Sequence, residues 1–169
     1  MIVLGIDPGL FGALVVLTDS GQAIGVRDTP IVQLKINGRM RHDYQVSEMV
    51  RLVQKATTWV VTEPCCAVLE HVNAMPDQGV TSMFTMGKGL GLWLGILAAL
   101  GVPCVLVRPQ RWKAMMLDGM DRSSKEAGRL RAQQLFPGVD LSLKKHHGRA
   151  DALLLAEYLR RTRSAPPAP

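Results

Sequence analysis

Two short apolar runs rich in β-branched residues begin the chain and limit what it can fold into. "MIVLGID" covers residues 1–7, "GALVVLTD" covers residues 12–19, and "PGLF" lies between them. Two apolar strands separated by such a turn signal are typical of an antiparallel hairpin. Residues 23–32, "AIGVRDTPIV", have the pattern of a third strand. The sequence therefore predicts an antiparallel meander at the N-terminus.

Helical and strand patterns alternate after this meander. Helices are expected over 46–56, from about 83 to 100, over 123–136 and from about 149 to 163, and strands over 65–72 and 103–109. Strands that come first as a meander and then alternate with helices predict a mixed α/β fold. We expect one domain over residues 1–162 and a disordered tail over 163–169, where small residues and prolines dominate.

The charge and the cysteines limit the function and the compartment. The formal net charge of +6 over 169 residues favours a polyanionic partner such as nucleic acid, although many basic proteins bind none. Cys65, Cys66 and Cys104 form neither a disulfide framework nor a zinc pattern, so we expect free thiols in the cytoplasm. Residues 89–107 carry no charge, but Gly101 and Pro103 divide them into a helix and a strand, which disfavours a membrane span.

Two acidic residues stand where apolar strands are expected to end. Asp7 follows the first run and precedes Pro8-Gly9, and Glu70 closes "CCAVLE". Asp7 could be an ordinary turn residue and Glu70 a solvated strand end. Because a carboxylate in apolar surroundings is costly unless it is paired or bound to metal, two of them in equivalent places suggest one shared ion.

A third acid comes from the predicted C-terminal helix. His147 and Asp151 are four residues apart, so they share one face if the helix extends back to His147. His147 could instead be merely polar, and Asp151 could simply complement the helix dipole. An oxygen-rich site of this kind suits Mg²⁺, and two such ions about 4 Å apart can activate water in phosphodiester cleavage.

Four motifs in order resemble the RuvC family of Holliday-junction resolvases, and most of all its phage and prophage branch. They are "GIDPG" at 5–9, "LEHV" at 69–72, "RPQRWK" at 108–113 and "GRADALLLAEY" at 148–158. The resemblance implies a ribonuclease H-like fold and a homodimeric endonuclease that uses two Mg²⁺ or Mn²⁺ ions per site. Such an enzyme resolves four-way junctions by paired nicks that leave 5′-phosphate and 3′-hydroxyl ends, in a bacterial or phage-infected cell. A broader flap and fork nuclease, or a catalytically silent DNA-binding relative, are the alternatives.

The resemblance also implies roles for individual residues. Asp7, Glu70, Asp151 and His147 would be the catalytic metal ligands. Further residues would contact DNA: Lys113, Lys125, Arg108, Arg111, Arg129, Lys144, Lys145 and His146. Trp112 is interpreted as a core residue. Gly87, Gly91 and Gly95, which recur every four residues on the long helix, are assigned to a dimer interface.

Two departures from the family pattern affect these expectations. The bacterial resolvases space their last two ligands three residues apart, whereas His147 and Asp151 are four apart, and an imidazole nitrogen favours Mn²⁺ over Mg²⁺. Where bacterial members carry an aromatic wedge, this chain has Asn73. Met75 or Phe84 could replace the wedge, and Phe84 could equally belong to the core.

Overall fold

The structure, a computed structural model, describes residues 1–58, 63–73, 78–122 and 124–164. The strands are β1 (Ile2–Asp7), β2 (Ala13–Thr18), β3 (Ala23–Asp28), β4 (Ile31–Ile36), β5 (Arg39–Tyr44), β6 (Cys65–Glu70) and β7 (Cys104–Val107). The helices are α1 (Val46–Thr58), α2 (Val80–Ala99), α3 (Pro109–Met116), α4 (Lys125–Leu135), the 3₁₀ helix η1 (Lys144–His146) and α5 (His147–Ser164).

Five strands form the central sheet in the order β3-β2-β1-β6-β7. β1 and β2, and β2 and β3, pair antiparallel, whereas β1 and β6, and β6 and β7, pair parallel. The predicted mixed sheet with an N-terminal meander is therefore confirmed. Because β1, β6 and β7 run in the same direction, their carboxyl ends meet at one edge of the sheet.

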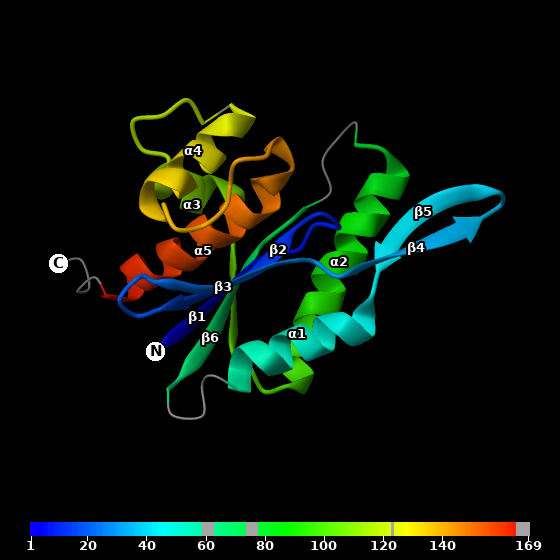
Figure 1. Ribbon diagram of the computed structural model, residues 1–169, viewed down its shortest axis with the longest axis horizontal. Coiled ribbons are helices and arrows are strands. Elements are labelled where there is room, and N and C mark those ends of the chain that lie inside the picture. The colour runs from blue at the N-terminus through cyan, green and yellow to red at the C-terminus, as the bar shows by residue number, and fades with distance from the viewer. Residues whose placement is uncertain (59–62, 74–77, 123, 165–169) are drawn as a thin grey trace.

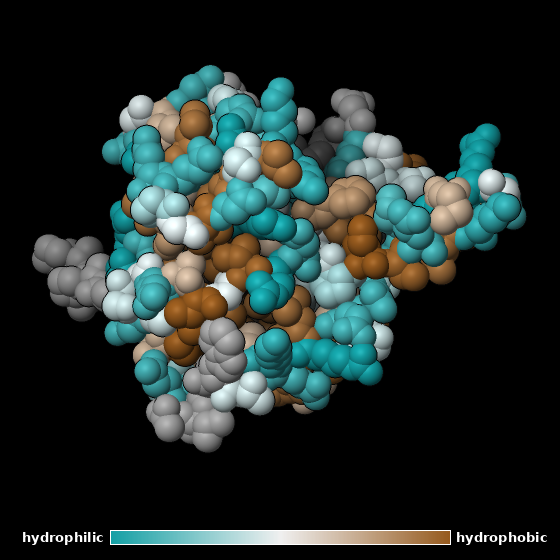
Figure 2. Space-filling model, viewed as in Figure 1, coloured by the Kyte–Doolittle hydropathy of each residue, from teal (hydrophilic) through white to brown (hydrophobic). Residues whose placement is uncertain are grey.

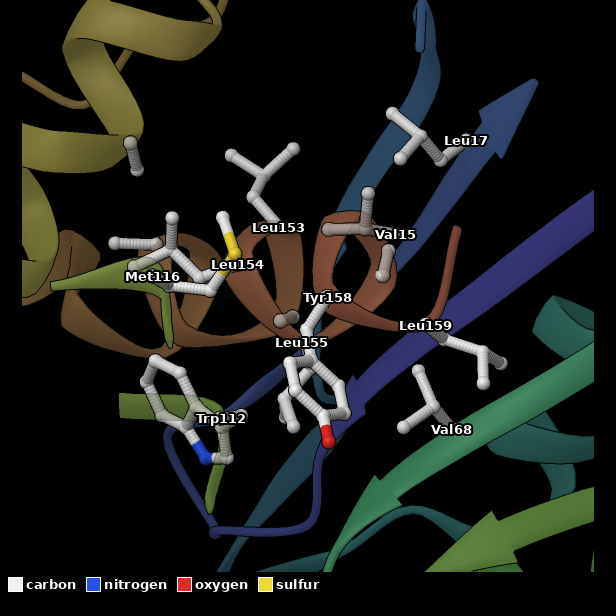
Figure 3. Close-up of a cluster of buried hydrophobic side chains, with 14 of the residues drawn as sticks. Val15, Leu17, Val68, Trp112, Met116, Leu153, Leu154, Leu155, Tyr158 and Leu159 are labelled. Carbon is white, nitrogen blue, oxygen red and sulfur yellow. The ribbon is translucent and has the colours of Figure 1, made fainter. Parts of the chain in front are cut away.

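Helices cover both faces of this sheet, so the molecule has three layers (Figure 1). Alternate residues of β1 point to opposite faces: Val3 joins a core formed with α3, α4 and α5, and Leu4 joins a core formed with α1 and α2. Figure 3 shows the first core, in which Leu153 and Leu154 of α5 lie close to Met116 of α3. Burying each such side chain contributes roughly 1.5–3 kcal/mol, so α5 is anchored firmly against the sheet.

The β4–β5 hairpin departs from the sequence prediction. The run predicted as one strand over 23–32 ends at Asp28, and Ile31 begins a second strand that pairs with β5 in a separate two-stranded sheet. Asn37 and Gly38 form the turn, both with positive φ. This hairpin projects beyond the three layers at the right of Figure 1.

The ends of two helices also differ from those predicted. α4 is capped by the Ser124 side chain, which accepts a hydrogen bond from the Glu126 amide, while residue 123 lies outside the described residues. α5 begins at His147 and continues through Ser164, so residue 163 is helical rather than part of a disordered tail. Residues 165–169 of that predicted tail lie outside the described part of the chain.

The uncharged run from residue 89 to 107 divides as expected into the end of α2 and strand β7. α2 is long and apolar enough to cross a membrane by length and composition alone. Its buried residues Trp93, Ile96 and Leu97 pack in the second core. The three cysteines are free thiols, and burial raises the pKa of Cys65 and of Cys104 to about 11.

Candidate active site

The register between β1 and β6 places Asp7 and Glu70 side by side. Ile6 pairs with Leu69, so the next residue on each parallel strand is the acid that ends it. Both acids keep part of their surface accessible at the carboxyl edge of the sheet. The sequence prediction that these two strand-end acids converge is consistent with this register.

Helix α5 brings the third acid to the same edge because small residues let its backbone approach β1 closely. A Cβ at Gly5 would lie 2.1 Å from the Ala152 carbonyl oxygen, so a larger residue at this position would push the helix away. A Cβ at Gly148 would lie 3.1 Å from Oδ2 of Asp7. The first turn of α5, which carries Gly148, therefore lies directly over the end of β1, and Asp151 follows in the next turn.

The charges of the three acids influence one another. Burial raises the pKa of Asp7 to about 6; the Gly9 amide, which donates a 3.0 Å hydrogen bond to Oδ1, opposes the rise, and the charge of Glu70 adds to it. Burial raises the pKa of Asp151 to about 7, and the charges of Asp7 and Glu70 contribute to that rise. The three carboxyls therefore lie within electrostatic range of one another.

Trp112 holds Glu70 in place, a role that the sequence interpretation missed. Its side chain is fully buried, which confirms it as a core residue. Its Nε1 also donates a 2.9 Å hydrogen bond to Oε1 of Glu70. This contact could have been inferred from the order of the strands. Glu70 of β6 pairs with Val107 of β7, so the helix that starts directly after β7 begins beside Glu70.

His147 begins α5, so it lies one helical turn before Asp151 as predicted. Its Nε2 lies 3.5 Å from Oε1 of Glu126 on α4. Glu126 is also held by Arg129, whose Nη2 donates a hydrogen bond of 2.6 Å to it. His147 thus contacts an acid that the sequence interpretation did not include, and its role as a metal ligand stays a prediction.

Lys113 lies beside the carboxyls. Its positive charge lowers the pKa of Asp7 and of Asp151 against the effect of burial, and its Nζ lies 5.2 Å from the centroid of the Trp112 ring. This position is consistent with the predicted contact to the scissile strand. The side chain of Lys125 lies outside the described residues, and only its backbone at the start of α4 is placed.

The other predicted DNA contacts divide into two groups. Arg108, Arg111, Lys144 and Lys145 are exposed, as phosphate contacts must be. Two assignments are corrected: His146 is only 4% exposed because the 3₁₀ turn directs its ring inward, where Nδ1 accepts from the Leu143 amide. Arg129 is tied internally to Glu126 and, through Nη1, to the Leu141 carbonyl at 2.9 Å.

The three residues considered for the position of the aromatic wedge differ in what the structure shows of them. Asn73 is exposed, Met75 lies outside the described residues, and Phe84 is 73% exposed rather than part of the core. Phe84 lies in the N-terminal half of α2. An exposed aromatic ring is therefore present near one end of this helix.

The donor set fits a hard divalent cation. Within the described residues, no three Asp, Glu, His or Cys side chains already surround a single point in a metal-binding arrangement. Burial is the main cause of the raised pKa of Asp7 and of Asp151, and the charges of the neighbouring acids add to it, so a bound cation would stabilise the ionised carboxylates. Oxygen ligands of this kind suit Mg²⁺ and Mn²⁺.

The chain is similar to known junction-processing proteins. No family model matches it. Over 86 residues it is 37% identical to the chloroplastic Holliday junction resolvase MOC1 of Chlamydomonas reinhardtii, a match that covers 50% of this chain and 10% of that protein.

Two solved structures of Thermus thermophilus RuvC have the same overall arrangement. One is in complex with a Holliday junction substrate and has a TM-score of 0.60, with 19% identity and 99% of both chains covered. The other has a TM-score of 0.60 and 21% identity, and it covers 99% of this chain and 100% of that one. The chain therefore has the ribonuclease H-like fold of RuvC.

Proposed function

We propose that this chain is a metal-dependent endonuclease that resolves four-way DNA junctions by paired nicks, leaving 5′-phosphate and 3′-hydroxyl ends. The observation that carries the proposal is the convergence of three acids, Asp7, Glu70 and Asp151, from two parallel strands and one helix. The net charge of +6 and the similarity to a junction resolvase support DNA as the substrate. Placement in the phage branch stays a prediction from the motifs.

Asp7, Glu70 and Asp151 would hold two divalent cations, with His147 as a further ligand. When bound, two such cations supply a hydroxide nucleophile and stabilise the leaving oxygen. The Gly9 amide fixes one oxygen of Asp7, and Trp112 fixes one oxygen of Glu70, so both carboxylates are oriented before substrate arrives. Lys113 supplies a positive charge against the phosphate of the strand to be cut.

Paired nicks require two sites, and the exposed face of α2 supports a homodimer. Val80, Phe84 and the three glycines all lie on the exposed side of this helix, and a Cβ at Gly87, Gly91 or Gly95 would meet open space. Small residues in a row permit a second helix to approach closely, and Phe84 would be covered by it. We therefore assign this face to the contact between two copies.

The test is cleavage of a synthetic four-way junction, mapped to the nucleotide, in Mg²⁺ and in Mn²⁺. Flap, fork and linear duplex substrates at matched concentrations separate a junction resolvase from a broader branched-DNA nuclease. Asp7→Asn should abolish cleavage and keep junction binding, because it removes a ligand charge without changing shape. Cleavage by this variant at the wild-type rate would refute the mechanism, and binding without cleavage by the wild type would indicate the catalytically silent alternative.

A further inference from the structure

Phe11 stands exposed next to the candidate active site. It lies four residues after Asp7 in the β1–β2 connection, and 67% of its surface is accessible. Its ring meets the His42 ring edge-on, with centroids 5.6 Å apart and an interplanar angle of 70°. Single exposed apolar residues are common, so exposure alone decides nothing. The position and the surroundings of this ring carry the inference.

The backbone that carries Phe11 is fixed from several sides. The Gly12 amide donates a 2.9 Å hydrogen bond to the Gly9 carbonyl, and the Thr29 amide donates one of 2.9 Å to the Gly12 carbonyl. Gly148 of α5 packs so closely that a Cβ there would lie 2.4 Å from the Phe11 carbonyl oxygen. The backbone at Phe11 is therefore held in a fixed position relative to the carboxyl edge of the sheet, where Asp7 lies.

The β4–β5 hairpin extends this surface outward. Residues directly opposite in an antiparallel pair share a face, and the register pairs Gln33 with His42 and Lys35 with Met40. The face of the hairpin that meets Phe11 thus continues from His42 to Lys35 near the tip. Figure 2 shows hydrophilic side chains over the outer end of the hairpin.

The hairpin carries uncompensated positive charge. From residue 35 to 42 it has Lys35, Arg39 and Arg41 and no acid, and all three cations are exposed. In the described part of the chain none of the three forms an ion pair. The acid at the hairpin base, Asp43, is occupied by Lys88 at 2.6 Å.

Charge decides between two occupants of this surface. Exposed Leu34, Ile36 and Met40 on the hairpin would also fit a second copy of the chain. In a symmetric contact the same patch faces itself, so unpaired cations would meet one another, on a chain that is already positive overall. A DNA duplex matches both the charge and the shape, because a two-stranded ribbon fits its major groove.

We propose that Phe11 and the face of the β4–β5 hairpin that carries His42 and Lys35 form one DNA-binding surface continuous with the active site, an inference that rests on the proposed function. Phe11 stacks on an unpaired base at the branch point, beside the phosphate to be cut. The His42 ring, which meets the Phe11 ring edge-on, supports it from the side of the hairpin. Lys35, on the same face of the hairpin as His42, binds phosphates of the duplex arm that leads to this base. Arg39 and Arg41, which pair with Ile36 and Leu34 on the opposite face of the hairpin, bind phosphates on the other side of the groove. Base stacking on an aromatic ring contributes roughly 1–3 kcal/mol.

The experiment measures binding of the full chain to a four-way junction with 2-aminopurine at the branch point, without divalent cations so that cleavage does not interfere. Phe11→Ala should weaken binding about 5- to 140-fold, as follows from that stacking energy. It should also abolish the change in 2-aminopurine fluorescence. Phe11→Leu keeps an apolar side chain without a ring and should behave like Phe11→Ala, whereas Phe11→Trp should bind like the wild type. Leu130→Ala, which removes an exposed apolar side chain from α4, is the matched control.

The charges are tested separately by salt dependence. Replacing Lys35, Arg39 and Arg41 together by Ala should reduce the slope of log Kd against log salt concentration by about 3, since each phosphate contact contributes about 0.9. The 2-aminopurine signal should persist at saturation. Lys55→Ala, which removes a charge from the far end of α1, should leave the slope unchanged.

The outcomes separate this inference from the proposed function. If the wild type cleaves junctions while Phe11→Leu and the triple variant bind as the wild type does, the inference is wrong and the proposed function stands. Wild-type chain that binds neither branched nor duplex DNA would overturn both. Melting temperatures equal to that of the wild type confirm that each variant is folded.

Discussion

The indole Nε1 of Trp112 donates a 2.9 Å hydrogen bond to Oε1 of Glu70. This bond connects the first turn of α3 to the carboxyl end of β6. The indole is fully buried, so it cannot follow the carboxylate if Glu70 moves. The bond therefore fixes one oxygen of Glu70. Trp112 acts as a positioning residue, not as a catalytic one.

Trp112→Phe should keep most of the packing and remove only this donor. We expect cleavage activity or apparent metal affinity to fall roughly 10- to 100-fold, the usual effect of losing a partner that orients a metal ligand. The metal concentration for half-maximal activity distinguishes a misplaced ligand from a general loss of structure. Trp93→Phe is the matched control because Trp93 is also buried, and its Nε1 has no hydrogen-bond partner among the described residues. Equal losses in both variants would contradict the positioning role.

The buried carboxyls predict how stability depends on pH in the absence of metal. Folding raises the pKa of Asp7 to about 6 and that of Asp151 to about 7 from a usual value of 3.8. Between about pH 4 and 7 the folded chain therefore holds protons that the unfolded chain has released, so stability falls as the pH rises through this window. Each unit of pKa shift corresponds to about 1.4 kcal/mol.

This fall in stability is measured by melting temperatures from pH 4 to 8 in the presence of a metal chelator. Asp7→Asn and Asp151→Asn should each flatten it, because an amide has no charge to desolvate. Adding Mg²⁺ at pH 8 should raise the melting temperature of the wild type more than that of either variant. A wild-type melting temperature that rises steadily over this range would show that folding does not raise the pKa values of these carboxyls.

Parts of the fold and site could be predicted because their signals are local. Apolar runs closed by an acid placed Asp7 and Glu70 at strand ends, and regular spacing placed Asp151 on a helix. The β4–β5 hairpin was missed although its signals are local. Val32, Leu34 and Ile36 alternate with Gln33 and Lys35. The Asn37-Gly38 dipeptide follows this run, and its two positive φ angles suit a hairpin turn.

Other features depend on contacts between distant segments, which no local pattern reveals. The bond from Trp112 to Glu70 spans 42 residues. His146 was predicted to contact DNA, but the 3₁₀ turn before α5 buries it and leaves His147 partly exposed. Arg129 was predicted to contact DNA, and its Nη1 donates a hydrogen bond to the Leu141 carbonyl, 12 residues away.

The close contact at Gly148 predicts sensitivity to a single methyl group. A Cβ there would lie 2.7 Å from the Gly12 Cα as well as against Asp7, so Gly148→Ala should shift α5 away from β1. We expect a loss of about 1–3 kcal/mol in the free energy of unfolding, as for other overpacked sites, with reduced cleavage. Gly138→Ala, where a Cβ meets nothing within 4 Å, should change neither. Denaturant unfolding and cleavage rates measure both, and an unchanged Gly148→Ala variant would refute the contact.

The exposed face of α2 predicts that one added charge prevents dimerisation. A side chain at Gly91 points into open space, so Gly91→Glu should leave the monomer folded while two copies repel each other across the interface. Light scattering should then give the mass of a monomer, and junctions should be nicked on one strand instead of two. Gly138→Glu is the control at an open position elsewhere. A Gly91→Glu variant with the same mass as a dimeric wild type would place the interface on another surface.

His147 predicts the choice of metal. An imidazole nitrogen favours Mn²⁺ over Mg²⁺, so the wild type should cleave faster in Mn²⁺ at equal concentration. His147→Asp replaces the nitrogen by oxygen and adds a negative charge, which should lower the ratio of Mn²⁺ to Mg²⁺ activity. Glu126→Gln removes the charge that lies 3.5 Å from His147 without changing the ligand, so it should leave the ratio close to that of the wild type. If His147→Asp leaves the ratio unchanged while overall activity persists, His147 does not bind the metal, and its contact with Glu126 is structural.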